Sequence, residues 1–179
     1  ISKGHVSIQI AITEASGGFG NGFDTGHEDF VNTNSSSQIA YVDPGANTSP
    51  SSDHATSVAS IAGAANGNNK GMTGAGYKCR LMLYNQVNGS MHGAILQAAI
   101  DGADIINCSW GSCSYNQNNQ DLITSVVDNY GCIIIAGAAN GNQGAGWCSG
   151  GPAVGFPDGQ GNYRNDYAYP ASYAGVFSV

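Results

Sequence analysis

Short apolar runs recur along the chain and are separated by longer segments rich in polar residues. Each run is five to eight residues long, is rich in Ile, Val or Leu, and is bounded by Gly, Asn, Asp or Ser. This pattern is typical of buried strands. The apolar residues are continuous rather than alternating with polar ones, so both faces of the resulting sheet should be covered. The predicted strands are 6–13, 38–42, 81–87, 104–108, 132–136 and 175–179.

Two segments between these strands repeat apolar residues with helical spacing. Residues 91–102 and 118–131 each end in a glycine, a common helix stop, and either Asn118 or Asn119 is expected to cap the second helix. Residues 81–136 therefore form two consecutive βαβ units, which require parallel strands. The pattern predicts one α/β domain over residues 1–179, with helices on the faces of a parallel sheet.

Composition excludes several classes of function. The formal net charge of −7 and the sequence pI of about 4.6 argue against a non-specific nucleic-acid binder. No apolar run approaches the length needed to cross a bilayer, so no membrane span is expected. The chain begins at Ile1 rather than Met, which we interpret as a processed N-terminus.

The cysteines point to an exported protein. None of the five forms a CxxC pair, so a structural zinc site is not predicted. Cys108 and Cys132 lie in apolar runs and are expected to be buried thiols. Cys113 and Cys148 lie in polar, Gly-rich loops, where a disulfide fits better. Because five is odd, at least one cysteine is free or pairs outside the chain. We expect a secreted or cell-surface protein.

A nucleotide site is not supported by the glycine-rich loop after the first strand. This loop, "SGGFGNGFDTG" at residues 16–26, has no G-x-G-x-x-G spacing and no helix after it, and no GxxxxGK[ST] motif occurs in the chain. A sugar- or nucleotide-binding α/β domain is therefore the weakest of the hypotheses considered.

One histidine stands at the head of a helix built from small residues. "DHATSVASIAGA" (53–64) places His54 before a run of Ala, Ser, Val, Ile and Gly that can pack closely against a sheet. The positive field of a helix N-terminus favours the neutral, basic imidazole, and a general base needs such a fixed mount. The alternative interpretation is a helix-terminal histidine bonded to a neighbouring residue.

The order of several motifs resembles that of subtilisin-like serine proteases, the subtilases. The histidine motif of that family, H-G-T-H-V-A-G, corresponds here to "HATSVAS", with Ala55, Ser57 and Ser60 as departures. Further matching segments are "IQIAITE", "HEDF", "ADIINCSWGS", "GCIIIAGAANGNQG" and "YPASYAGVFSV". The resemblance implies a subtilisin-like, three-layer α/β sandwich with a mostly parallel, doubly wound sheet, and a secreted endopeptidase that acts on protein or peptide substrates.

The resemblance also assigns roles to individual residues. His54 would take the proton of the nucleophile and return it to the leaving amine, and Asn140 would donate its side-chain amide to the oxyanion. The substrate backbone would pair with Ser109, Trp110 and Gly111 as an added strand, and Ala138 and Ala139 would line the main specificity pocket.

Two carboxylates compete for the role of the acid that orients the histidine. The family places an Asp at the end of its first strand, and Glu14 aligns there, although its side chain is one methylene longer. Asp24 in "FDTG" matches the family motif D-[ST]-G in its residues, but it follows no predicted strand. We prefer Glu14 and retain Asp24 as the alternative.

A structural calcium ion is also implied by the resemblance. Asp29 in "HEDF" and Asn68 in "NGNNKG" match family positions that bind calcium through oxygen atoms. The alternative is that both are ordinary turn residues.

The family nucleophile lies in a G-T-S-M-A motif that is absent from these 179 residues. Ser172 and Ser178 align with a strand and not with the nucleophile helix. We therefore interpret the chain as the N-terminal portion of a catalytic domain, whose partner would be the C-terminal remainder of the same protease. The alternative is a pseudoprotease, a binding or structural module that keeps the subtilase fold.

Overall fold

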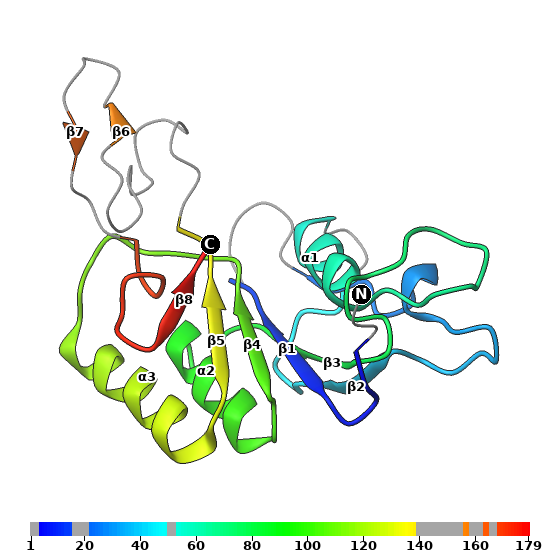
Figure 1. Cartoon of the computed structure of the whole chain (residues 1–179), viewed down its shortest axis with the longest axis horizontal. Helices are drawn as coiled ribbons and strands as arrows, with labels where there is room; N and C mark the ends of the chain where they lie inside the picture. Colours follow the sequence, from blue (N-terminus) through cyan, green and yellow to red (C-terminus); the bar gives the residue numbers. More distant parts are fainter. Residues whose placement is uncertain (1–3, 16–21, 50–52, 139–155, 158–162, 165–167) are drawn as a thin grey trace.

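The computed structural model describes residues 4–15, 22–49, 53–138, 156–157, 163–164 and 168–179 (Figure 1). Six strands form one sheet in the order β2-β3-β1-β4-β5-β8, and every pairing between neighbours is parallel. These strands are β1 (Gln9–Thr13), β2 (Ile39–Val42), β3 (Arg80–Tyr84), β4 (Ile105–Cys108), β5 (Ile133–Ala136) and β8 (Val176–Ser178). The predicted α/β fold with a parallel sheet is confirmed.

Helices connect the strands. They are η1 (Glu28–Phe30), α1 (Asp53–Gly63), α2 (Met91–Ile100) and α3 (Gln117–Tyr130). A separate antiparallel pair consists of β6 (Phe156–Pro157) and β7 (Tyr163–Arg164), which the sequence pattern did not predict. Among the helices that the structure describes, none combines the length and apolar character that a membrane crossing requires.

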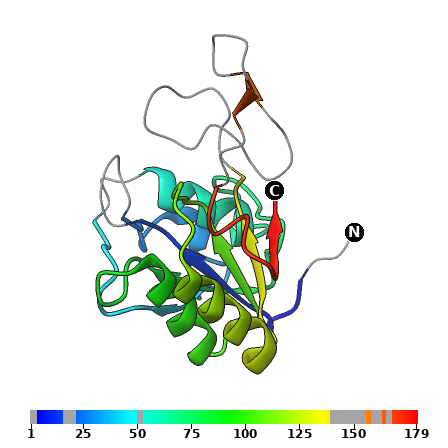
Figure 2. The ribbon, with the colours of Figure 1, turned by 90° about the vertical axis from the view of Figure 1, so that its left-hand side faces the viewer.

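The sheet separates two apolar clusters, so the fold has three layers. Ala11 and Met82 face the cluster that contains α2 and α3, whereas Ile12, Leu81 and Leu83 face the cluster that contains α1. Alternate residues of β1 and β3 thus point to opposite faces, and both faces are covered. In the two ribbon views, α2 and α3 run side by side (Figures 1 and 2).

Several element boundaries differ from the sequence prediction. The first strand begins at Gln9 rather than residue 6 because the chain turns there, with the Ile8 N–H donating to the His5 carbonyl. The predicted cap of α3 was wrong, since Asn116 caps it by accepting hydrogen bonds from the N–H groups of Asn118 and Asn119. Gly131 ends α3 in the left-handed conformation (φ 70°), as predicted.

The cysteine predictions hold for the residues described. Cys108 and Cys132 are buried free thiols, as is Cys79. Cys113 is disulfide-bonded, and Cys148 lies outside the described residues. Burial raises the pKa of the Cys108 thiol to about 12, so this group does not ionise at physiological pH.

Candidate active site

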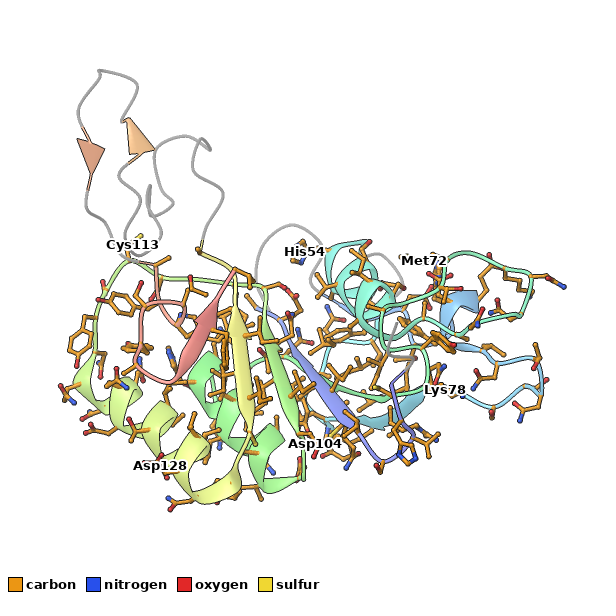
Figure 3. The ribbon with its side chains drawn as sticks, viewed as in Figure 1. His54, Met72, Lys78, Asp104, Cys113 and Asp128 are labelled. Atoms are coloured by element: carbon orange, nitrogen blue, oxygen red, sulfur yellow. The ribbon has the colours of Figure 1, made fainter. Side chains whose placement is uncertain are left out.

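Glu14 and His54 meet at the carboxyl edge of the sheet. Glu14 directly follows β1. His54 is the second residue of α1 and is labelled at that helix in Figure 3. Glu14 Oε2 lies 3.1 Å from His54 Nδ1. The Glu14 side chain is 2% exposed, whereas that of His54 is 51% exposed. A buried carboxyl group therefore holds an imidazole that remains accessible from solvent.

Backbone and amide contacts fix the position of Glu14. Its N–H donates to the Tyr84 carbonyl at 3.0 Å, which continues the β1–β3 pairing one residue beyond the strands. Its carbonyl accepts a hydrogen bond from Asn85 Nδ2 at 3.0 Å, and Asn85 Oδ1 accepts one from the Asn47 N–H at 2.7 Å. The carboxyl group thus extends from a backbone that is held on both sides.

Small residues bring α1 close to the sheet. Ala55 and Ala59 are fully buried in the cluster that also contains Leu81 and Leu83. A Cβ atom on Gly63 would lie 2.8 Å from Leu81 Cδ2, so a side chain at this position would force Leu81 to move. This close packing fixes the helix that carries His54 relative to the strand that carries Glu14.

Burial raises the pKa of Glu14 from its ordinary value of 4.5 to about 8. Glu14 Oε1 is buried and has no hydrogen-bond partner among the described residues, where the His54 contact is the one that compensates for the lost hydration of the carboxylate. The Glu14 carboxyl therefore keeps a proton through the neutral range and becomes a carboxylate under mildly alkaline conditions.

The free energy of unfolding should fall as pH rises between 4.5 and about 8. In that interval the unfolded chain has ionised Glu14 and the folded chain has not, so folding takes up a proton. The stability that this carboxyl contributes is complete below pH 4.5 and is lost as pH passes through 8, with an upper bound of about 5 kcal/mol. Urea unfolding from pH 4 to 9 measures the slope. Glu14→Gln is the control and should flatten it, and equal slopes in the two proteins would contradict the expectation.

Asp24, the alternative acid, lies in a different local arrangement. Its N–H donates to Thr56 Oγ1 at 2.9 Å, and its Oδ1 accepts a hydrogen bond from the Gly26 N–H at 3.1 Å. Within the described part of the chain, no hydrogen bond or ion pair joins Asp24 to His54. The structure brings Glu14, and not Asp24, to the imidazole.

The predicted substrate segment follows β4 at the same edge of the sheet. Ser109 Oγ accepts a hydrogen bond from Asn107 Nδ2 at 2.9 Å, and Trp110 Nε1 donates to Thr13 Oγ1 at 3.0 Å. Gly111 is exposed. Beyond it, Ser112 and Tyr169 exchange two backbone hydrogen bonds of 2.8 Å, which hold the end of the segment.

The third predicted group follows β5. The Ala138 N–H donates to the Val179 carbonyl at 2.7 Å, which places Ala138 at the carboxyl edge beside the end of β8. Ala139 and Asn140, the latter being the predicted oxyanion donor, lie outside the described residues.

Asp29 and Asn68, the residues predicted to bind calcium, are held by hydrogen bonds to other described residues, and the calcium site stays a prediction. Asn68 directs its Nδ2 to the carbonyls of Glu28 and Val31, at 3.1 and 2.8 Å, and its Oδ1 accepts from the Lys70 N–H. Calcium binds oxygen ligands and not amide N–H groups. Asp29 Oδ1 accepts from the Met72 N–H at 3.0 Å. In the described ranges, no cluster of three or more His, Cys, Asp or Glu side chains could hold a metal.

Sequence reasoning missed Asn85 and Thr13. The predicted strand 81–87 hid Asn85 inside an apolar run, but β3 ends at Tyr84 and Asn85 is the first residue beyond it. The available signal for the end of β3 was the polar amide of Asn85 after four apolar residues. Thr13 is fully buried and precedes Glu14, yet its hydroxyl contacts residues that follow almost a hundred positions later, which no local pattern reveals.

Comparison with known proteins gives a family match and solved structures of similar fold. Residues 5–179 match the model of the Subtilase family. No curated protein sequence matches the chain. Among solved structures, Apa1, a psychrophilic subtilisin-like protease from the Antarctic psychrotroph Pseudoalteromonas sp. AS-11, is similar with a TM-score of 0.66 and 21% identity, over 96% of this chain and 35% of that chain.

Two other solved structures show the same fold. MycP1 from Mycobacterium smegmatis has a TM-score of 0.59 and 17% identity, covering 97% of this chain and 51% of that chain. Fervidolysin from Fervidobacterium pennivorans, a keratinolytic enzyme related to subtilisin, has a TM-score of 0.59 and 19% identity, covering 97% of this chain and 24% of that chain. The chain thus spans about half or less of the length of these three proteins.

Proposed function

This chain belongs to the subtilase family of serine peptidases, and from that membership we propose that it forms the acid- and base-bearing part of a secreted endopeptidase. The observation that carries the proposal is the 3.1 Å contact between Glu14 Oε2 and His54 Nδ1. A buried carboxyl that orients an accessible imidazole is the arrangement by which such enzymes activate a serine.

His54 carries the proton, and Glu14 orients and stabilises His54. As a carboxylate, Glu14 accepts a hydrogen bond from the Nδ1–H of His54 and so leaves Nε2 free to accept a proton. His54 then takes the proton of the nucleophile during attack and returns it to the leaving amine, while Glu14 stabilises the imidazolium that forms in between. The longer glutamate side chain occupies the place of the family aspartate.

We assign the nucleophile to a segment that follows Val179. The serine motif of the family occurs nowhere in these 179 residues, and the chain spans 35% of Apa1 and 51% of MycP1. In this proposal the C-terminal remainder of the same protease is the partner that completes the site.

Ser109, Trp110 and Gly111 pair with the substrate backbone, and Ala138 and Ala139 line the specificity pocket. Support comes from the place of this segment at the end of β4, beside the strand that carries Glu14. Asn140 donates to the oxyanion; the corresponding asparagine of subtilisin itself is worth about 2.7–4 kcal/mol of barrier, a figure taken from that enzyme.

The proposed location is extracellular or at the cell surface. The disulfide at Cys113 supports it, because disulfides persist in oxidising compartments.

The second candidate function is a pseudoprotease, and one observation favours it. Burial raises the pKa of Glu14 to about 8, so at neutral pH the group that should orient His54 as a carboxylate is largely protonated. A module that only binds peptides would not need a negatively charged Glu14 carboxylate.

A fluorophosphonate probe separates the two functions. We expect the complete protein that contains this chain to be labelled on one serine and to cleave casein, with faster labelling at pH 9 than at pH 7 because Glu14 is ionised there. A folded protein that is neither labelled nor cleaves casein at either pH would establish the pseudoprotease.

A further inference from the structure

Trp110 connects the predicted substrate segment to the strand that carries Glu14. The indole Nε1 donates to Thr13 Oγ1 at 3.0 Å. Thr13 is the last residue of β1, is fully buried, and directly precedes Glu14. The hydroxyl of Thr13 donates in turn to the Asn107 carbonyl at 2.8 Å, in β4. One hydroxyl therefore joins the ends of two neighbouring strands to the indole.

One aromatic contact holds the indole from the α2 side, and a second holds its partner His92. The ring of His92, in the first turn of α2, meets that of Trp110 edge to face at 5.2 Å, and meets the ring of Tyr173 at 5.8 Å. His92 is 8% exposed, and in the part of the chain that the structure describes its Nε2 is buried without a hydrogen-bond partner. Burial lowers the pKa of His92, so it packs as a neutral aromatic ring.

We propose that the hydrogen bond from Trp110 to Thr13 holds Ser109–Gly111 in the conformation that binds the substrate backbone, which makes Thr13 a positioning residue for peptide binding. This inference rests on the proposed function. The segment follows β4, and its far end is tied by the Ser112–Tyr169 backbone pair. The indole anchors the middle of the segment to β1.

Removing either partner leaves a polar group without its partner. The Thr13 hydroxyl donates to the Asn107 carbonyl, lies 3.4 Å from Cys108 Sγ and accepts from the indole. Valine, which has nearly the same shape, loses these contacts and leaves the indole N–H without this acceptor. The expected consequence is a segment that samples other conformations and must be ordered when peptide binds. Because this cost applies equally to the ground state and the transition state, it should appear in KM and not in kcat.

Steady-state kinetics of the complete protein with tetrapeptide p-nitroanilides tests this inference. Thr13→Val and Trp110→Phe should each raise KM about tenfold and change kcat by less than about threefold. Thr13→Ser keeps the hydroxyl and should restore KM. The double variant should resemble either single variant, since both remove the same bond. Thr124→Val, at an exposed position of α3, is the matched control and should leave KM unchanged.

Fluorescence provides a readout that does not depend on cleavage. The chain has two tryptophans, so in a Trp147→Phe background Trp110 is its only indole. In the complete protein, any tryptophan outside this chain is likewise replaced. The emission of Trp110 should shift in Thr13→Val and not in Thr13→Ser. Titration with acetylated tetrapeptide amides should show about tenfold weaker binding for Thr13→Val.

The outcomes distinguish this inference from the proposed function. If the protein binds peptides in a Thr13-dependent way but neither cleaves nor reacts with fluorophosphonate, the endopeptidase proposal fails and the positioning role stands. The positioning role is overturned if the protein cleaves peptides and Thr13→Val shifts the Trp110 emission but changes neither KM nor peptide affinity. If it neither binds nor cleaves, both are overturned.

Discussion

His54→Ala is expected to lower kcat of the complete enzyme by about 10⁶-fold, the loss that subtilisin itself shows without its histidine. The physical reason is that His54, the imidazole in contact with Glu14, is the base proposed to take the proton of the nucleophile. The variant should still fold, since half of this side chain is already exposed. Single-turnover acylation by a peptide ester and circular dichroism measure the two effects.

His27 offers the matched control for that experiment. It lies beside Asp29, with Nδ1 3.7 Å from Asp29 Oδ2, and is 40% exposed. His27→Ala removes an imidazole of similar exposure and should leave kcat within about threefold. A His54→Ala enzyme that still acylates at near the wild-type rate would remove His54 from the mechanism.

Glu14→Gln is expected to lower kcat by about 10⁴-fold, as the change from carboxylate to amide does in a serine protease triad. An amide cannot stabilise the imidazolium, and its N–H group favours the wrong tautomer of His54. The same change should raise the free energy of unfolding above pH 8, because an ionised carboxyl is then replaced by a neutral group in a buried place. At pH 9, Glu14→Gln should therefore lower kcat and raise the free energy of unfolding measured in urea.

Asp24→Asn distinguishes the two candidate acids. We expect it to change kcat by less than about threefold, because the contacts of Asp24 are with Thr56 and Gly26. Glu14→Asp keeps the charge but shortens the reach across the 3.1 Å contact, so its activity should fall between wild type and Glu14→Gln. A severe loss in Asp24→Asn together with a mild loss in Glu14→Gln would reverse the assignment.

The strands could be predicted because burial on both faces leaves a continuous apolar signal. Runs such as "CIIIA" and "DIINC" are strands in the structure, each one residue shorter at its start. Boundaries were less certain because they depend on contacts distant in sequence. β3 ends where Asn85 turns its side chain to Glu14 and Asn47; the polar amide marks this position in the run 81–87, but its two partners lie outside the run.

The candidate site could be predicted only in part, for the same reason. Motif order pointed to His54, and alignment with the family favoured Glu14. The sequence left Asp24 open as the acid, because Glu14 matches the family position at the end of the first strand whereas Asp24 matches the residues of the family motif. The hydrogen-bond contact of Glu14 Oε2 with His54 Nδ1 distinguishes them. The Trp110–Thr13 bond joins residues 97 positions apart, so its partner could not be read from the sequence.

The close packing of α1 limits how this helix can change. Ala55 and Ala59 have no free surface, and the end of the helix at Gly63 touches Leu81. Substitution there is filtered by volume more than by polarity, so exchange of alanine for glycine or serine should be tolerated better than exchange for valine. In directed evolution of this protein, gains in activity should therefore come from loops at the carboxyl edge of the sheet, while libraries aimed at the inner face of α1 should yield few folded variants.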